Sequence, residues 1–177
     1  MTVERTGERR VENLGAPPTG ERRSLKDRRT QSNLLYSSFR IGDTTFILNI
    51  HQVQEVLQAQ EMVTVPLSSG LVAGLINLRG EIVPAVNLRP VLGIHDALKE
   101  TDNMNVVIYS PVGIFSLIVD EVHDILEVSP SMIQATPPSL PGYLKALTNG
   151  ICKLSSSLLM VLDIDGVVRM IESHNQA

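Results

Sequence analysis

The sequence predicts an all-β fold whose short strands close, or nearly close, into a barrel. From Leu34 onward, short apolar runs alternate with polar residues, glycine and proline, and many of the runs contain β-branched residues. This pattern is typical of strands and not of long helices. A closed sheet is expected because closure removes exposed strand edges. The 177 residues are enough for one domain with a hydrophobic core and an additional tail.

Turn residues divide the apolar runs into expected strands. Gly42 and Asp43 predict a tight turn between the first two runs, and residues 111–113 predict another between a later pair. Antiparallel hairpins are therefore expected at both places. The expected strands span residues 34–41, 44–50, 81–88, 105–110, 113–119, 124–128, 150–154 and 158–164.

Two segments carry a helical pattern. In residues 50–57 the apolar residues are spaced by three, three and one, which predicts one face of a short helix. Residues 165–172 predict a terminal helix, with Asp165 near its positive end and with Val168 and Ile171 buried.

Residues 1–32 differ from the rest of the chain in composition. They lack hydrophobic periodicity and contain eight Arg or Lys against five acidic residues, whereas the remaining residues have a net charge of −7. We expect 1–32 to be a disordered, charged tail and 33–177 to be one folded domain. A solvated leader is the favoured interpretation of the tail; the alternative is a docking segment for an acidic partner or a nucleotide phosphate. The acidic body argues against nucleic-acid binding.

The sequence predicts no catalytic, cofactor or metal site, and so a protein that is not an enzyme. Its histidines are scattered and are expected on the surface. Because the chain has a single cysteine, no disulfide can form within it, and this cysteine is expected in the core. No apolar run reaches the length of about 18 residues that spans a bilayer, and the first 30 residues lack the apolar stretch of a secretory signal, which predicts a cytoplasmic protein. The serines at 155–157 are expected in a turn, and Asp120, Glu121 and Asp124 in a solvated turn. The histidines and the cysteine considered as candidates are His51, His95, His123, His174 and Cys152.

The most informative segment is residues 71–94. Two apolar runs flank Asn77, Leu78, Arg79 and Gly80, which predicts a strand pair with a bidentate cation at its mouth. Arg79 is therefore either an interface anchor or the partner of a carbonyl or carboxylate of its own domain.

The Asn-Leu-Arg-Gly motif at 77–80, followed by a strand that ends in Asn-Leu-Arg at 87–89, resembles the CheW family. The resemblance extends from the expected first hairpin to the closing strand and helix, and leaves out the tail. The segments of this chain that resemble the family are 36–46, 53–56, 71–94, 113–122 with Ile125 and Leu126, and 158–168.

This resemblance implies two intertwined five-stranded SH3-like barrels with short helices. It also implies a chemotaxis signal-transduction adaptor that couples methyl-accepting chemoreceptors to the CheA histidine kinase, without catalysis or cofactors, in the cytoplasm at membrane receptor arrays. The implied partners are the regulatory domain of the kinase, the cytoplasmic tip of the receptor and other CheW-like domains in rings. The implied receptor-binding residues are Ile50, Val53 and Glu55, and the implied coupling residues are Asn77, Arg79 and Gly80. Ile50 and Val53 could alternatively be core residues.

Two departures and two alternatives accompany the resemblance. Asn87 stands where the family usually has Asp, and residues 143–150 predict a longer loop that carries Lys145. The first alternative is a CheW-like scaffold of a twitching-motility or surface-sensing pathway. The second is a module whose tail binds a nucleotide or nucleic acid.

Overall fold

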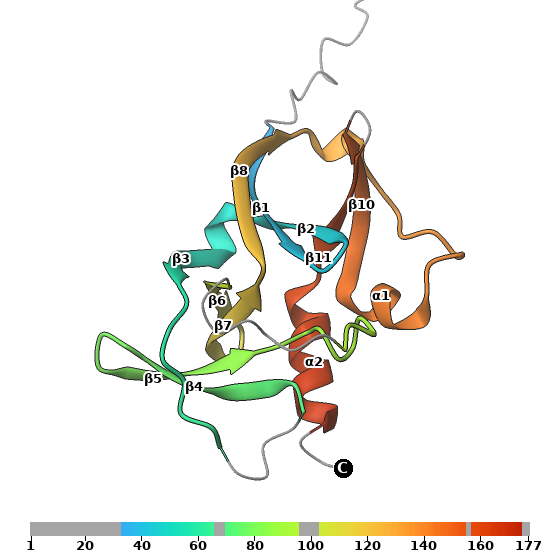
Figure 1. Ribbon diagram of the computed structural model, residues 1–177. Helices are drawn as coiled ribbons and strands as arrows, with labels where there is room; N and C mark the ends of the chain where they lie inside the picture. Colours follow the sequence, from blue (N-terminus) through green and yellow to red (C-terminus); the bar gives the residue numbers. More distant parts are fainter. Residues whose placement is uncertain (1–32, 66–69, 96–102, 155–156, 175–177) are drawn as a thin grey trace, which may run out of the picture. The chain divides into compact units, whose positions relative to one another are not determined.

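Two β-sheets and a few short helices make up the part of the chain that the computed structural model describes (Figure 1). The described residues are 33–65, 70–95, 103–154 and 157–174. The predicted tail and the serines at 155 and 156 lie outside them. The all-β prediction with short helices is confirmed.

The first sheet, sheet A, combines strands from both ends of the described chain. Its strand order is β8-β1-β2-β11-β10-β9, and β2 pairs in parallel with β11 while the other neighbours are antiparallel. The predicted turn at Gly42 is confirmed, with φ of 59°. The strands are β1 Leu34–Ile41, β2 Thr44–Asn49, β8 Glu121–Val128, β9 Ile133–Gln134, β10 Thr148–Leu154 and β11 Ser157–Leu162.

The second sheet, sheet B, is built from one continuous part of the sequence. Its order is β3-β6-β7-β5-β4. Val63, which follows β3, exchanges two backbone hydrogen bonds with Leu75 of β4, each 2.9 Å long, and so brings the two edges together. This arrangement is compatible with the barrel that the resemblance implies. The strands are β3 Val53–Gln58, β4 Val72–Leu78, β5 Glu81–Val86, β6 Met104–Ser110 and β7 Gly113–Val119.

The helical predictions were partly right. The terminal helix is confirmed as α2, Ile164–His174. The helix expected over 50–57 is wrong: only the 3-10 turn η1, Ile50–Gln52, is helical, and β3 follows it. The pairing of β3 with β6 shifts register between Val53 and Glu55, and such a bulge breaks the two-residue alternation of a strand. The remaining helical elements are η2, Pro130–Met132, and α1, Gly142–Leu147.

Helix α1 also corrects the expectation of a long loop at 143–150. Lys145 lies in this helix, and its Nζ donates a hydrogen bond of 2.5 Å to the carbonyl of Pro138. Gly166 of α2 packs against α1 so closely that an added Cβ would lie 2.1 Å from the carbonyl oxygen of Ala146. The backbones of the two helices are therefore in direct contact at this point, and the contact requires a glycine.

Three apolar clusters hold the described residues together. One lies on sheet B and is formed around Ile76, Val83 and Val107, and a second lies on sheet A around Ile47 and Cys152. The largest cluster is shared by both sheets and by the helices. Its fully buried members include Phe39, Phe46, Leu48, Val86, Leu88, Val106, Ile108, Leu117, Leu147 and Val167. Because this cluster joins the sheets, they are expected to be stable only together.

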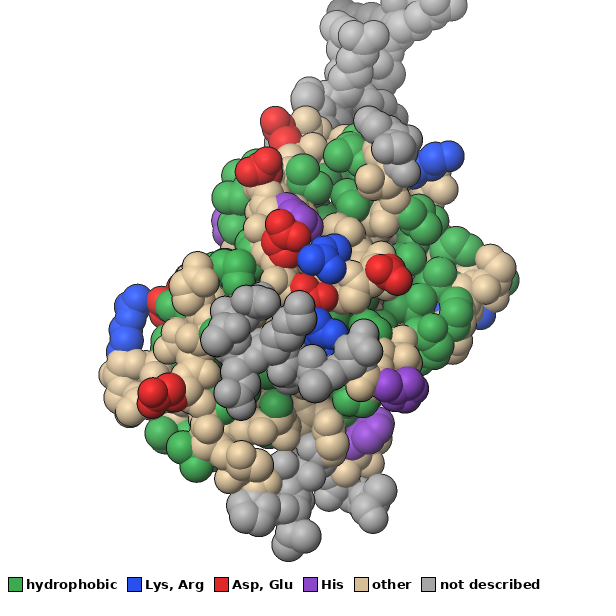
Figure 2. Space-filling view, in the orientation of Figure 1, with side chains coloured by type: hydrophobic (Ala, Val, Ile, Leu, Met, Phe, Trp, Pro, Cys, Tyr) green, Lys and Arg blue, Asp and Glu red, His purple; other side chains and the backbone are tan. Residues whose placement is uncertain are grey.

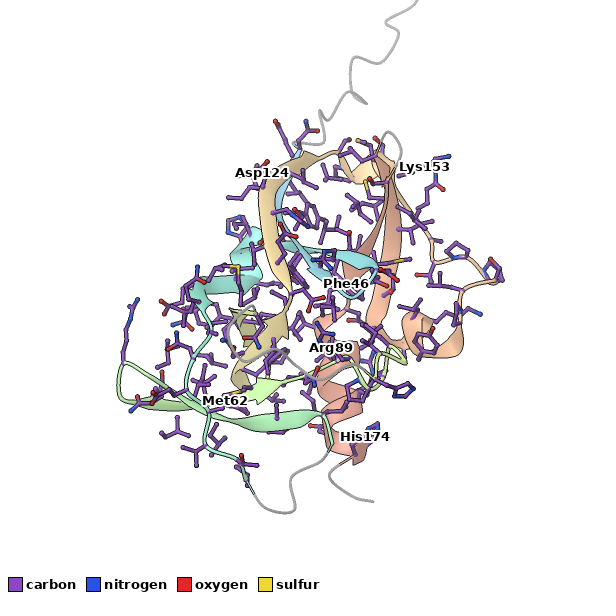
Figure 3. All side chains as sticks on the ribbon, in the orientation of Figure 1. Phe46, Met62, Arg89, Asp124, Lys153 and His174 are labelled. Atoms are coloured by element: carbon purple, nitrogen blue, oxygen red, sulfur yellow. The ribbon has the colours of Figure 1, made fainter. Side chains whose placement is uncertain are left out.

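A half-buried ionic network lies where the chain passes from sheet B to sheet A. Asp120, between β7 and β8, accepts from Arg89 on Oδ1 and from the backbone N–H of Gly42 on Oδ2, the latter at 2.7 Å. Arg40 Nη1 lies 3.5 Å from the same Oδ2. Figure 2 shows acidic and basic side chains gathered at the centre of the visible face, and Figure 3 labels Arg89 there.

The network corrects the expectation of a solvated turn at residues 120–124. The side chain of Asp120 is 13% exposed and that of Arg89 is 15% exposed, and Glu121 and Asp124 belong to strand β8. The predicted exposure of the four histidines and the burial of Cys152 are confirmed. No helix among the described residues is long and apolar enough to cross a membrane.

Candidate functional site

The candidate site is centred on the hairpin between β4 and β5. Leu78 pairs with Glu81, so Arg79 and Gly80 form a two-residue turn. Both have positive φ, 54° and 93°, as a type I′ hairpin turn requires. The Oδ1 atom of Asn77 accepts a hydrogen bond of 2.8 Å from the N–H of Gly80 and so holds the turn. The structure thus brings the three predicted coupling residues together, with Asn77 and Gly80 supporting Arg79.

Arg79 is connected to the second candidate segment. Its Nη2 donates a hydrogen bond of 2.7 Å to Oε2 of Glu55 on β3, 24 positions away in the sequence. The Arg79 side chain is 79% exposed, whereas that of Glu55 is 18% exposed. Arg79 therefore pairs with a carboxylate of its own domain through one nitrogen, as one of the two alternatives predicts, while most of its side chain is exposed; its role as an interface anchor stays a prediction.

The three predicted receptor-binding residues lie in one short stretch, but they do not share one role. Val53 is half-buried and packs against the shared core, so the core alternative applies to part of its surface. Ile50 is half-buried at the start of η1. Asn49 caps this turn, since its Oδ1 accepts from the N–H of His51 at 3.0 Å. Of the three, only Glu55 is bonded to the β4–β5 hairpin, through Arg79.

An apolar groove next to the hairpin was missed by the sequence reasoning. It has a volume of about 650 Å³, and its lining includes the apolar residues Val63, Leu75, Ile76 and Ile82 together with Gln60, Glu61 and Asn77. Val63 is 72% exposed and Ile82 is 63% exposed. The signal that could have revealed it is the alternation of β5, where Ile82 and Pro84 face away from Val83 and Ala85. Exposed apolar side chains beside a partly free arginine are typical of a protein-binding surface.

The described residues contain no group of three or more His, Cys, Asp or Glu side chains that could hold a metal ion. Burial raises the pKa of the Cys152 thiol. Burial, and to a smaller extent Cys152, raises the pKa of the Tyr36 phenol. Both groups are therefore neutral near pH 7, and neither has the lowered pKa of an activated nucleophile.

The fold and this surface define a class of protein: a small two-sheet β protein with an exposed arginine and exposed apolar side chains on one surface. The family model for the CheW-like domain matches residues 36–172. The chain belongs to the CheW-like domain family.

Named relatives agree with this assignment. The chain is 30% identical to the chemotaxis protein CheW of Rhizobium meliloti over 130 residues, covering 73% of this chain and 84% of that protein. It is 28% identical to the chemotaxis protein CheW of Thermotoga maritima over 134 residues, covering 76% and 87%. The crystal structure of the scaffolding protein TtCheW from Thermoanaerobacter tengcongensis is similar with a TM-score of 0.68 and 25% identity, covering 75% of this chain and 90% of that one.

Proposed function

We propose that the chain is a non-catalytic chemotaxis adaptor that couples the cytoplasmic tip of a methyl-accepting chemoreceptor to the regulatory domain of a CheA-type histidine kinase. The family membership and the relatives named chemotaxis protein CheW support a role in chemotaxis. The observation that carries the coupling role is the Glu55–Arg79 ion pair. It links β3, which carries the candidate receptor-binding residues Val53 and Glu55, to the β4–β5 hairpin.

The ion pair supports coupling because either partner protein can compete for it. A receptor group that binds Glu55 would weaken its ion pair with Arg79 and free the arginine. In the same way, a kinase group that binds Arg79 would free the Glu55 carboxylate for the receptor. An ion pair whose arginine is 79% exposed is strongly screened by solvent and typically contributes less than about 1 kcal/mol to stability. Breaking it is therefore expected to change binding more than folding.

The test compares the wild-type chain with Arg79→Ala and Glu55→Gln in a reconstituted assay of receptor-containing membranes, kinase and adaptor. We expect Arg79→Ala to lower receptor-dependent kinase activity by about tenfold or more, because an exposed arginine at an interface is often a hot spot. Glu55→Gln is expected to reduce both receptor binding and kinase activity. Circular dichroism should show native structure for both variants.

The control is Lys153→Ala, which removes another exposed cationic side chain, on β10 and outside the candidate site. It should couple like the wild type. Normal coupling by Arg79→Ala, or an unfolded Arg79→Ala protein, would contradict the assigned role of this residue. A pull-down tests the adaptor proposal itself. If the wild-type chain, used as bait, recovers neither a receptor nor a kinase from cytoplasm and membranes, the proposal is contradicted.

Residues 1–32 lie outside the described part, and their role stays a prediction. A chain that begins at Ser32 is expected to bind receptor and kinase as the full chain does, if the tail is accessory. Binding that is lost with the tail would instead support the alternative in which the tail carries its own ligand.

A further inference from the structure

A second, polar pocket lies on sheet A, away from the groove beside the hairpin. It has a volume of about 270 Å³. Strand β1 contributes Tyr36, the junction of β2 and η1 contributes Asn49 and Gln52, β10 contributes Asn149, and the start of α2 contributes Asp163 and Asp165. Tyr36 and Asn49 are register partners on β1 and β2. The pocket is therefore located where several strands of sheet A end.

Tyr36 is the most unusual member of this lining. It is only 6% exposed, and its hydroxyl has no hydrogen-bond partner among the residues that the structure describes. The hydroxyl of a buried tyrosine normally finds a partner. The hydroxyl is not among the buried side-chain atoms of the described residues that lack a partner, so it is accessible from the pocket, where a ligand group can complete its hydrogen bonding.

The other polar groups favour a donor-rich, positively charged ligand group. Asp165 is exposed and makes no ion pair among the described residues. Asp163 uses Oδ2 to accept a bond of 3.1 Å from Arg169 and keeps its second oxygen. The side-chain carbonyls of Gln52 and Asn149 add further acceptors. The N-terminus of α2 carries a partial positive charge of about half an elementary charge. The negative charge of the two carboxylates is larger, so the pocket still attracts a cation.

The size of the pocket suits one side chain. A volume of about 270 Å³ is below the usual range for a drug-sized ligand, about 300–1,000 Å³, and is sufficient for a guanidinium with part of its stem. A guanidinium offers five donors in a planar fork and no acceptor, and it is more weakly hydrated than an ammonium group. It therefore matches the carboxylate oxygens of Asp163 and Asp165 and the amide oxygens of Gln52 and Asn149.

We propose that this pocket binds an arginine side chain of the chemoreceptor tip. The proposal rests on the proposed function, because the receptor is chosen as the source from the position of the pocket. Asn49 and Gln52 enclose Ile50 in the sequence, and Val53 and Glu55 follow directly. A receptor segment that covers Ile50 and Val53 would pass the pocket, and the arginine would add an anchor separate from the Glu55–Arg79 pair.

The first experiment tests the chemistry of the pocket without a receptor. N-acetyl-arginine amide is titrated into the full chain, and NMR shifts of the Asn149 and Gln52 side-chain amides are followed. N-acetyl-citrulline amide, which has a similar shape and no charge, is the ligand control. We expect saturable shifts with the arginine compound, and a several-fold weaker response in Asp165→Asn and in Tyr36→Phe.

Glu172→Gln removes another exposed acid of α2, outside the pocket, and should respond like the wild type. Equal shifts with the arginine and citrulline compounds, or an unchanged response in Asp165→Asn, would overturn the assignment of a guanidinium site. Spectra of Tyr36→Phe also show whether the loss of one hydroxyl leaves the fold native.

The second experiment tests the source of the arginine with the cytoplasmic signalling fragment of the receptor that co-purifies with the chain. Asp165→Asn and Tyr36→Phe should each weaken binding of this fragment by about three- to tenfold, with kinase binding unchanged. Normal receptor binding by both variants would overturn the pocket proposal and leave the adaptor proposal intact. A wild-type chain that binds no receptor fragment, but does bind the arginine compound, would overturn the adaptor proposal and the choice of receptor.

Discussion

At the scale of single residues, Asp120 is the clearest example of a side chain whose surroundings the local sequence does not reveal. It stands beside Glu121 and close to Asp124, and a run of acids is usually solvated. In the fold, Arg89 and Arg40 approach the same carboxylate from distant parts of the chain, and the N–H of Gly42 completes its coordination. The carboxylate therefore joins the connection after β5 to the first hairpin.

We expect Asp120→Ala to lower the free energy of unfolding by about 3–5 kcal/mol, because it leaves the charge of Arg89 half-buried without its partner. Urea denaturation measures the change. Glu121→Ala is the control, since that side chain is 55% exposed and pairs with Arg40 at the surface; its effect should stay below about 1 kcal/mol. Similar effects of the two substitutions would show that the burial of Asp120 has no energetic consequence.

At the scale of elements, the sequence predicted strands well where a turn residue marked their ends. Gly42 and the segment 111–113 define two hairpins, and β7 has the predicted bounds, Gly113–Val119. The helix expected over 50–57 failed because the bulge between Val53 and Glu55 mimics a helical spacing. Bulges depend on the partner strand, and the partner β6 is not recognisable from residues 50–57 alone.

The candidate site was predictable to a similar extent. The motif at 77–80 identified the turn and its exposed arginine. The bond between Arg79 and Glu55 could not be predicted, because it depends on β3 and the β4–β5 hairpin lying side by side. The alternation of β5 could have identified Ile82 as exposed, but Val63 reaches the same groove only through its pairing with Leu75, which the sequence does not reveal.

The Gly42 turn supports an element-scale prediction. Its φ of 59° is strained for alanine, and an added Cβ would lie 2.3 Å from Cδ1 of Ile94. We expect Gly42→Ala to destabilise the protein by about 1–3 kcal/mol, measured by urea denaturation. Ile94→Val removes that methyl group, so the double variant should be less destabilised than the sum of the two single variants. Strict additivity would mean that backbone strain alone accounts for the loss.

At the scale of the whole molecule, the shared apolar cluster makes the two sheets one cooperative unit. Sheet A supplies Phe39 and Phe46, whose rings stack with centroids 6.1 Å apart, and sheet B supplies Val106 and Ile108. Each sheet also has its own smaller cluster. The proposed coupling between receptor and kinase depends on this shared cluster, because it keeps the partner-binding surfaces at fixed positions.

Phe46→Ala should therefore destabilise both sheets together. Phe46 is fully buried, and removal of a buried phenyl ring typically costs about 3–5 kcal/mol. Hydrogen exchange of amides in sheets A and B is expected to accelerate by the same factor in this variant. Val63→Ala, at a position that is 72% exposed, is the control and should leave exchange nearly unchanged. Faster exchange confined to sheet A would contradict a single cooperative unit.

The parallel pairing of β2 with β11 also constrains how the chain folds during its synthesis. Sheet B is encoded in one continuous stretch, so its strands can pair as soon as β7 has left the ribosome. The first hairpin must wait for β11, since Phe46 pairs with Met160. Contacts between such distant residues close slowly, because a long loop must be ordered first. Until then the edge of β2 that pairs with β11 stays open, so one of the first strands to be made is among the last to be protected from aggregation.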